Sequence, residues 1–212
     1  MVKIPHKTLE RNLFRQGYGR VVGVDEVGMG CLAGPVVVCA VSFTKQFYDR
    51  SHPALAGLRD SKLLQPHQRE AFARELMADR NLRYVVSVVY PREIDILNIF
   101  QSARAGMRRA IARVRPKDAR ANAIVLVDGP HRIAGIAHQQ IPIVKGDRKI
   151  FAIACASIIA KVYRDNMMTR YAKRFPGYGF EQHKGYGTPL HRARLATLGP
   201  CPLHRRSFRG VR

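Results

Sequence analysis

Residues 21–43 read VVGVDEVGMGCLAGPVVVCAVSF. Two valine-rich runs, 21–25 and 35–43, are separated by a turn that carries three glycines. Apolar β-branched runs joined by a glycine-bearing turn are typical of paired strands, so this stretch predicts the start of a sheet. It also holds the first functional signal, because the adjacent carboxylates Asp25 and Glu26 close the first run.

The rest of the chain alternates strand-like apolar runs with segments of helical periodicity. We expect further strands at 82–90, 123–127 and 140–144, helices at 65–79 and 94–114, a long helix that Asp147 caps and that reaches about residue 173, and a loop at 175–189. Such alternation predicts an α/β domain with a mixed sheet flanked by helices. With 212 residues the chain fits one domain, residues 1–212, with a small C-terminal helical and loop region from about 175.

The charge balance is strongly basic. Lys and Arg total 37 against 15 Asp and Glu, which gives a formal net charge of +22. Such a surface attracts polyanions, and nucleic acid is the commonest for a protein of this size, although a basic solubility device is the alternative. No stretch of about 20 apolar residues predicts a membrane span, and the cysteines form no CxxC pair. We expect a reduced, cytoplasmic, monomeric protein without a membrane partner.

Acidic residues are scarce, yet several follow or interrupt apolar segments. Asp25 and Glu26 end the first strand, Asp128 directly follows an Ile-Val-Leu-Val run, and Asp165 extends the apolar stripe of the long predicted helix. Each has a structural alternative, since Asp128 could begin a turn with the following Gly-Pro and Asp165 could pair with Lys161 one turn back. Together, in an acid-poor chain, these four carboxylates indicate a metal cluster.

Geometry sets a condition on this cluster. Neighbouring strand residues point to opposite faces, so Asp25 and Glu26 share a site only if the strand ends or twists there, which Gly28 and Gly30 permit. Carboxylate oxygens select Mg²⁺ or Mn²⁺ rather than zinc. Four carboxylates that hold two such ions beside a polyanion-binding surface indicate phosphodiester hydrolysis by two-metal-ion catalysis.

Eight short segments, in their order and spacing, resemble bacterial ribonuclease HII, the type 2 ribonuclease H. They are GVDEVGMG (23–30), LRDSK (58–62), EIDILN (93–98), VDG (127–129), VKGD (144–147), ASIIAKVYRD (156–165), HKGYGT (183–188) and HRRSF (204–208). The resemblance runs from Val21 to about Phe208 and implies a ribonuclease H-like fold. It also implies hydrolysis of the RNA strand of RNA–DNA hybrids and incision 5′ of single ribonucleotides in duplex DNA, leaving 3′-hydroxyl and 5′-phosphate ends.

The resemblance further implies roles for individual residues. The catalytic and metal-binding acids would be Asp25, Glu26, Asp128 and Asp165. The substrate-binding residues would be Gly28, Met29, Gly30, Ser61, Lys62, Lys184 and Tyr186. In the family the glycine tripeptide, here Gly28–Met29–Gly30, senses the ribose 2′-hydroxyl through its backbone. The tyrosine, here Tyr186, packs against the sugar at the RNA-to-DNA junction. This chain departs from the pattern at Met29, where the family usually has arginine.

Two other function classes remain open on the sequence. A non-catalytic basic nucleic-acid-binding protein explains the charge but gives no reason for the four acids. A DNA nuclease on the same fold explains both, and its preference for an all-DNA branched substrate would distinguish it.

Overall fold

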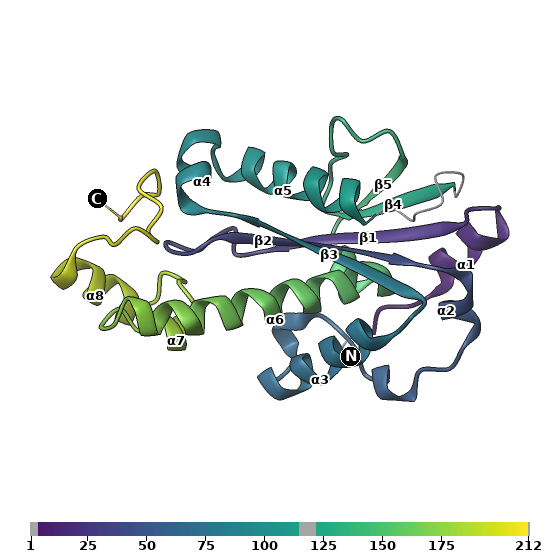
Figure 1. Ribbon diagram of the computed structural model, residues 1–212, viewed down its shortest axis with the longest axis horizontal. Coiled ribbons are helices and arrows are strands. Elements are labelled where there is room, and N and C mark those ends of the chain that lie inside the picture. Colours follow the sequence, from purple (N-terminus) through teal and green to yellow (C-terminus); the bar gives the residue numbers. More distant parts are fainter. Residues whose placement is uncertain (1–3, 115–121, 212) are drawn as a thin grey trace.

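A five-stranded sheet forms the centre of the computed structural model, which describes residues 4–114 and 122–211 (Figure 1). The strand order is β3-β2-β1-β4-β5. The strands are β1 (Arg20–Val27), β2 (Val36–Phe43), β3 (Leu82–Val89), β4 (Ala123–Asp128) and β5 (Gln139–Ile143). β1 pairs antiparallel with β2 and β2 with β3, whereas β4 runs parallel to both β1 and β5. The predicted mixed α/β sheet is therefore confirmed.

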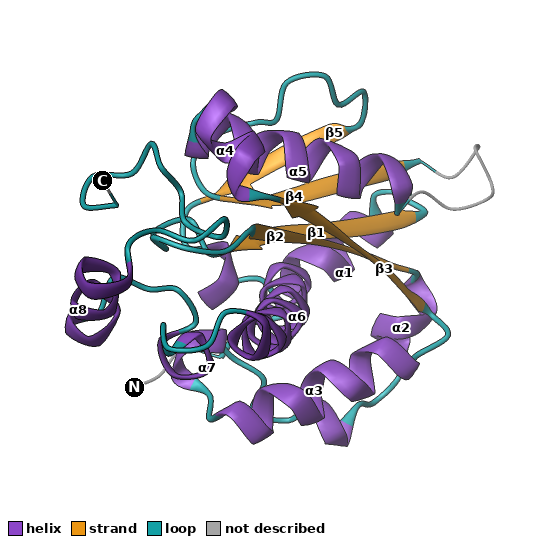
Figure 2. Cartoon of the chain, turned by 60° about the vertical axis from the view of Figure 1, so that its left-hand side comes forward, coloured by secondary structure: helices purple, strands orange, loops and turns teal. Residues whose placement is uncertain are grey.

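Helices cover both faces of the sheet, as Figure 2 shows. On one face lie α4 (Pro91–Leu97) and α5 (Ile99–Arg113); on the other lies α6 (Phe151–Arg174), with α3 (Pro66–Ala78) packed on its outer side. The remaining helices are α1 (Thr8–Arg15), α2 (Lys45–Asp49), α7 (Phe180–His183) and α8 (Pro189–Leu198), with 3₁₀ turns at Pro53–Leu55, Ser61–Leu63 and Gly146–Arg148. None of the helices in the described residues is long and apolar enough to cross a membrane.

The first ten residues of α6 are buried on every side because they lie between the sheet and α3. Gly23 on β1 makes this close packing possible. A Cβ at that position would lie 2.3 Å from the carbonyl carbon of Ala152, so any side chain there would push α6 off the sheet. The helix then brings Ser157 beside Asp25 of β1, where the candidate site lies.

The expected single helix at 94–114 is wrong in one respect, because the structure has two helices there, separated at Asn98. This residue has a positive φ of 67°, and its side chain accepts a hydrogen bond from the Gln101 N–H at 3.1 Å. Asn tolerates this conformation and caps helices well, so α4 ends there and α5 begins. Apolar periodicity does not show such a break.

Two other local expectations also differ from the structure. Asp147 does not cap α6: it lies in the Gly146–Arg148 turn, and the buried carboxylate of Glu10 instead accepts the Ala152 N–H at 2.9 Å. The expected loop at 175–189 contains the short helix α7. A cap supplied from the other end of the chain lies beyond any local sequence signal.

The C-terminal segment folds back onto the glycine-bearing turn after β1. Cys31 forms an isolated antiparallel bridge with Tyr186, and Ala33 forms one with His204. In Figure 1, α7, α8 and the C-terminus accordingly lie together at one end of the sheet. Residues separated by more than 150 positions in sequence thus meet beside the end of β1.

Candidate active site

A cavity of about 610 Å³ opens where β1 loses one of its neighbours. β4 pairs with β1 only as far as Val24, whereas β2 stays paired through Val27. The β4 side of β1 is therefore open beside Asp25 and Glu26. The cavity is lined by Asp25, Glu26, Val27, Gly28, Met29, Gly30, Ser61, Lys62, Arg69, Asp128, Asp147, Ser157, Lys161 and Tyr186.

Asp25 and Glu26 both line this cavity although the strand stays regular. Asp25, 4% exposed, has the register of the β1 residues that pack under α6, and Glu26 has the register of those under α5. The backbone N–H of Glu26 donates to Asp25 Oδ1 at 2.8 Å. The expectation that β1 itself must end or twist is replaced by a different device, because its neighbour β4 ends instead.

Asp128 brings a fourth acid to the cavity, and this acid is Asp147. Asp128 Oδ1 accepts the backbone N–H of Gly146 at 2.6 Å. Lys145 takes a left-handed conformation (φ 56°) to make the turn, and a Cβ on Gly146 would lie 2.5 Å from Ile153 Cδ1. This turn leaves Asp147 6% exposed among the cavity-lining residues. Its sequence signal was the VKGD segment, which the helix-capping interpretation misassigned.

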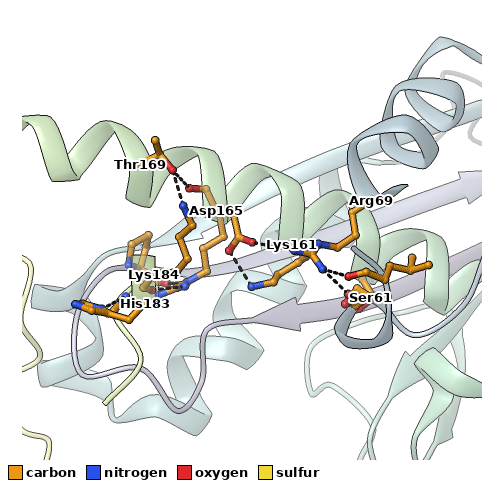
Figure 3. A network of polar contacts seen from close by, with 12 residues as sticks. Ser61, Arg69, Lys161, Asp165, Thr169, His183 and Lys184 are labelled. Atoms are coloured by element: carbon orange, nitrogen blue, oxygen red, sulfur yellow. Dashed lines mark hydrogen bonds and ion pairs between the residues drawn. The ribbon is translucent and has the colours of Figure 1, made fainter. Parts of the chain in front are cut away.

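Asp165 lies outside the cavity. It is eight residues beyond Ser157 on α6, which corresponds to roughly 12 Å along the helix axis. Its Oδ1 accepts a hydrogen bond from Lys161 Nζ at 2.9 Å, and its Oδ2 lies 3.8 Å from Arg69 (Figure 3). The structure therefore groups Asp147, and not Asp165, with the other three acids.

A second cavity of about 660 Å³ lies beside the first, and Asp165 lines it. Arg69, Lys161 and Tyr186 line both cavities. Lys184 lines only the second, and its Nζ donates to Thr169 Oγ1 at 2.6 Å. Lys184 is thus separated from the four acids of the first cavity, and the cations Arg69 and Lys161 lie between the two cavities.

Asp25, Glu26 and Asp147 have raised pKa values. Burial, followed by the charges of Glu26 and Asp128, raises the pKa of Asp25 well above its usual range. Burial and then Asp128 raise the pKa of Glu26 to about 7. Burial, Asp128 and Asp60 raise the pKa of Asp147. The repulsion among these carboxylates favours binding of a cation.

The donor set fits a hard divalent cation. Within residues 4–114 and 122–211, no three His, Cys, Asp or Glu side chains lie so as to hold a metal ion between them in this conformation. Four carboxylates instead surround an open cavity, which suits Mg²⁺ because that ion keeps several of its waters and takes few protein ligands. The nearest cation to Asp147 is the Lys62 ammonium, at 3.9 Å and largely exposed, so it does not neutralise the group.

Four of the predicted substrate-binding residues that line the cavity come from the segment after β1 and from the loop that carries Tyr186. Gly28 takes φ 99°, and a Cβ there would lie 2.3 Å from Arg164 Nε. The Met29 side chain is partly buried against the apolar cluster beneath α5. Tyr186 places its ring 5.6 Å from Lys161 Nζ. Gly30 is open, since a Cβ there would meet no atom within 4 Å.

Ser61 and Lys62 line the cavity from the 3₁₀ turn Ser61–Leu63. Buried Asp60 accepts the Lys62 N–H at 2.9 Å and an Arg148 Nε–H at 2.9 Å, which holds the Ser61–Leu63 turn in place. Ser61 Oγ lies 3.1 Å from Ser157 Oγ. The sequence interpretation did not assign Ser157 and Lys161 to the site, although both lie in the 156–165 segment. Arg69 had no sequence signal.

Comparisons with known proteins agree on one family. The family model described as ribonuclease HII matches residues 22–211. Ribonuclease HII of Syntrophotalea carbinolica is 44% identical over 204 residues, covering 96% of this chain and 91% of its own, and that of Maricaulis maris is 45% identical, covering 100% and 92%. The structure of the PCNA:RNase HII complex from Archaeoglobus fulgidus superposes with a TM-score of 0.71 at 28% identity, covering 89% of this chain and 95% of that one.

Proposed function

The chain belongs to the ribonuclease HII family of metal-dependent phosphodiester hydrolases that act on RNA–DNA hybrids, and on that premise we propose that it also incises 5′ of single ribonucleotides in duplex DNA. The observation that carries the proposal is the convergence of Asp25, Glu26, Asp128 and Asp147 on one cavity beside the glycine tripeptide. Carboxylates for cations and backbone donors for a ribose thus share one surface.

The four acids have the role of binding two Mg²⁺ or Mn²⁺ ions. Such ions, when bound, polarise the scissile phosphate and make water a better nucleophile, so that hydrolysis leaves 3′-hydroxyl and 5′-phosphate ends. Burial keeps the acids close and under-solvated, which strengthens their affinity for cations. Asp128 has the further role of holding the Gly146–Arg148 turn, and with it Asp147, at the end of β4.

The surrounding residues bind and orient the nucleic acid. Lys62, Lys161 and Arg69 provide positive charge for the phosphates on either side of the cleaved bond. The backbone of Gly28 to Gly30 contacts the ribose 2′-hydroxyl, and the Tyr186 ring packs against the neighbouring sugar. Lys184 lies farther along, in the second cavity, where it contacts a more distant phosphate.

Asp128→Asn tests the proposal directly. With Mg²⁺ or Mn²⁺, the wild type is expected to cut an RNA–DNA hybrid and a duplex with one ribonucleotide, but not all-DNA duplex, and the variant is expected to lose both activities. Retained cleavage by the variant would contradict the site. Preferred cleavage of branched all-DNA would instead indicate a DNA nuclease, and binding without cleavage under every metal would indicate a non-catalytic binder. Monomeric state and cytoplasmic location stay predictions.

A further inference from the structure

Two fully buried arginines hold the segment that follows β1. Arg205 donates from Nη2 to the Gly28 carbonyl at 2.6 Å, from Nη1 to that of Met29 at 2.8 Å and from Nε to that of Gly34 at 3.0 Å. Both Arg164 and Arg205 are 0% exposed. Among residues 4–114 and 122–211, neither forms an ion pair with a carboxylate. Backbone carbonyls therefore solvate both charges.

The two arginines hold different carbonyls. Arg164 donates to Ala33 at 3.1 Å, to Pro35 at 2.9 Å and to Lys184 at 2.8 Å. It therefore joins the later part of the segment to the loop that carries Tyr186. Arg205 donates to the carbonyls of Gly28 and Met29, whereas Arg164 donates to neither.

The hydrogen bonds of Arg205 to the Gly28 and Met29 carbonyls set the direction of the Met29 and Gly30 N–H groups. The structure contains no cis peptide in its described residues, and in a trans peptide the N–H points opposite to the C=O. The Gly28 and Met29 carbonyls point to Arg205, so the N–H groups of Met29 and Gly30 point away from it. Within the described residues, neither N–H donates a hydrogen bond to the protein. Both residues line the cavity, whereas Arg205 does not.

We propose that Arg205 is a positioning residue for ribose recognition: its guanidinium fork holds the Gly28 and Met29 carbonyls so that the Met29 and Gly30 N–H groups are fixed as donors to the 2′-hydroxyl. This inference rests on the proposed function, which assigns that tripeptide to the ribose. A planar guanidinium with donors in fixed directions matches two successive carbonyls, whereas a lysine ammonium is a single point charge.

The test measures the ratio of affinities for a duplex with one ribonucleotide and for the same duplex with a deoxynucleotide there. The Asp128→Asn background keeps the substrate intact. Arg205→Lys keeps the charge and is expected to lower the ratio about tenfold, the loss expected for weakening two neutral hydrogen bonds. Affinity for the all-DNA duplex is expected to stay within about twofold.

Two matched variants separate positioning from general support. Arg164→Lys removes the other buried fork but keeps the Arg205 hydrogen bonds to the Gly28 and Met29 carbonyls, so the ratio is expected to fall clearly less than in Arg205→Lys. Arg206→Lys changes the exposed neighbouring arginine and is expected to have no effect. An unchanged ratio in Arg205→Lys, or an equal loss in Arg205→Lys and Arg164→Lys, would overturn the inference.

Amide hydrogen exchange tests the same inference without changing Arg205, in case Arg205→Lys does not fold. The ribonucleotide duplex is expected to protect the Met29 and Gly30 amides at least about fivefold more than the all-DNA duplex, and equal protection would overturn the inference. A wild-type protein that cleaves hybrids but shows no preference for a duplex containing a ribonucleotide would contradict the proposed incision and this inference together. A preference that survives Arg205→Lys would contradict the inference alone.

Discussion

The carboxylates of the cavity and the two buried arginines differ in what surrounds their buried charge. Asp25 and Asp147 lie beside other acids, and their pKa values are raised. Arg164 and Arg205 are as deeply buried, yet six backbone carbonyls accept their hydrogen bonds. A buried charge satisfied by its own backbone fixes a conformation, whereas like charges gathered without compensation favour a ligand of the opposite sign.

The largest expected effect separates Asp147 from Asp165. Asp147→Asn removes an acid from the uncompensated group, and we expect cleavage of a ribonucleotide-containing duplex to fall on the order of 10³-fold. Asp165→Asn removes a carboxylate that Lys161 and Arg69 already neutralise, so we expect less than about a tenfold change, mainly in KM. Steady-state kinetics with Mg²⁺ measures both. Equal losses would return Asp165 to the catalytic group.

A smaller effect concerns the stability of the metal-free protein. Burial raises the pKa of Glu26 from 4.5 to about 7, so the free energy of unfolding falls as the pH rises between these two values, and the full cost is present above about 7. Glu26→Gln removes this cost, and we expect it to raise the free energy of unfolding at pH 8 by on the order of 1 kcal/mol. The gain is expected to shrink as the pH falls from about 7 and to vanish only below about 4.5, where the acid is protonated in both states.

Urea unfolding at pH 8 and at pH 5 in the presence of a chelator measures this change. Saturating Mg²⁺ is expected to reverse its sign, because only the wild type retains all four acids for the cation. A Glu26→Gln protein no more stable than the wild type at pH 8 would show that the buried Glu26 carboxylate does not destabilise the metal-free protein.

The smallest expected effect is at Met29, whose side chain packs partly buried at the cavity rim. In Met29→Arg the aliphatic stem can follow the same apolar surface while the guanidinium reaches solvent beside the substrate phosphates. We expect KM for the ribonucleotide duplex to fall about threefold, with the Mg²⁺ dependence unchanged. Met29→Leu, which keeps the apolar contact, is the control. No change on hybrid or single-ribonucleotide substrates would show that the side chain is idle.

Local patterns were sufficient for most of the fold. The valine-rich runs predicted β1 and β2, and helical periodicity predicted α3 closely, because each signal repeats within one element. They were insufficient at Asn98, where one positive φ and one side-chain cap divide a periodic stretch into two helices. They also misassigned Asp147, since a helix cap and a cavity acid look alike in sequence.

The sequence by itself determined the family, the basic surface, the mixed sheet and the segments from which the site is built. Only the tertiary structure decided which acid joins Asp25, Glu26 and Asp128. Asp147 and Asp165 are both aspartates, and the sequence alone does not show which of them lies near the other three. The tertiary structure likewise showed that Arg205, near the end of the chain, holds the carbonyls of Gly28 and Met29. The physical reason is the same in both cases: a carboxylate or guanidinium takes its role from the charges and carbonyls around it, and here those come from distant segments of the chain.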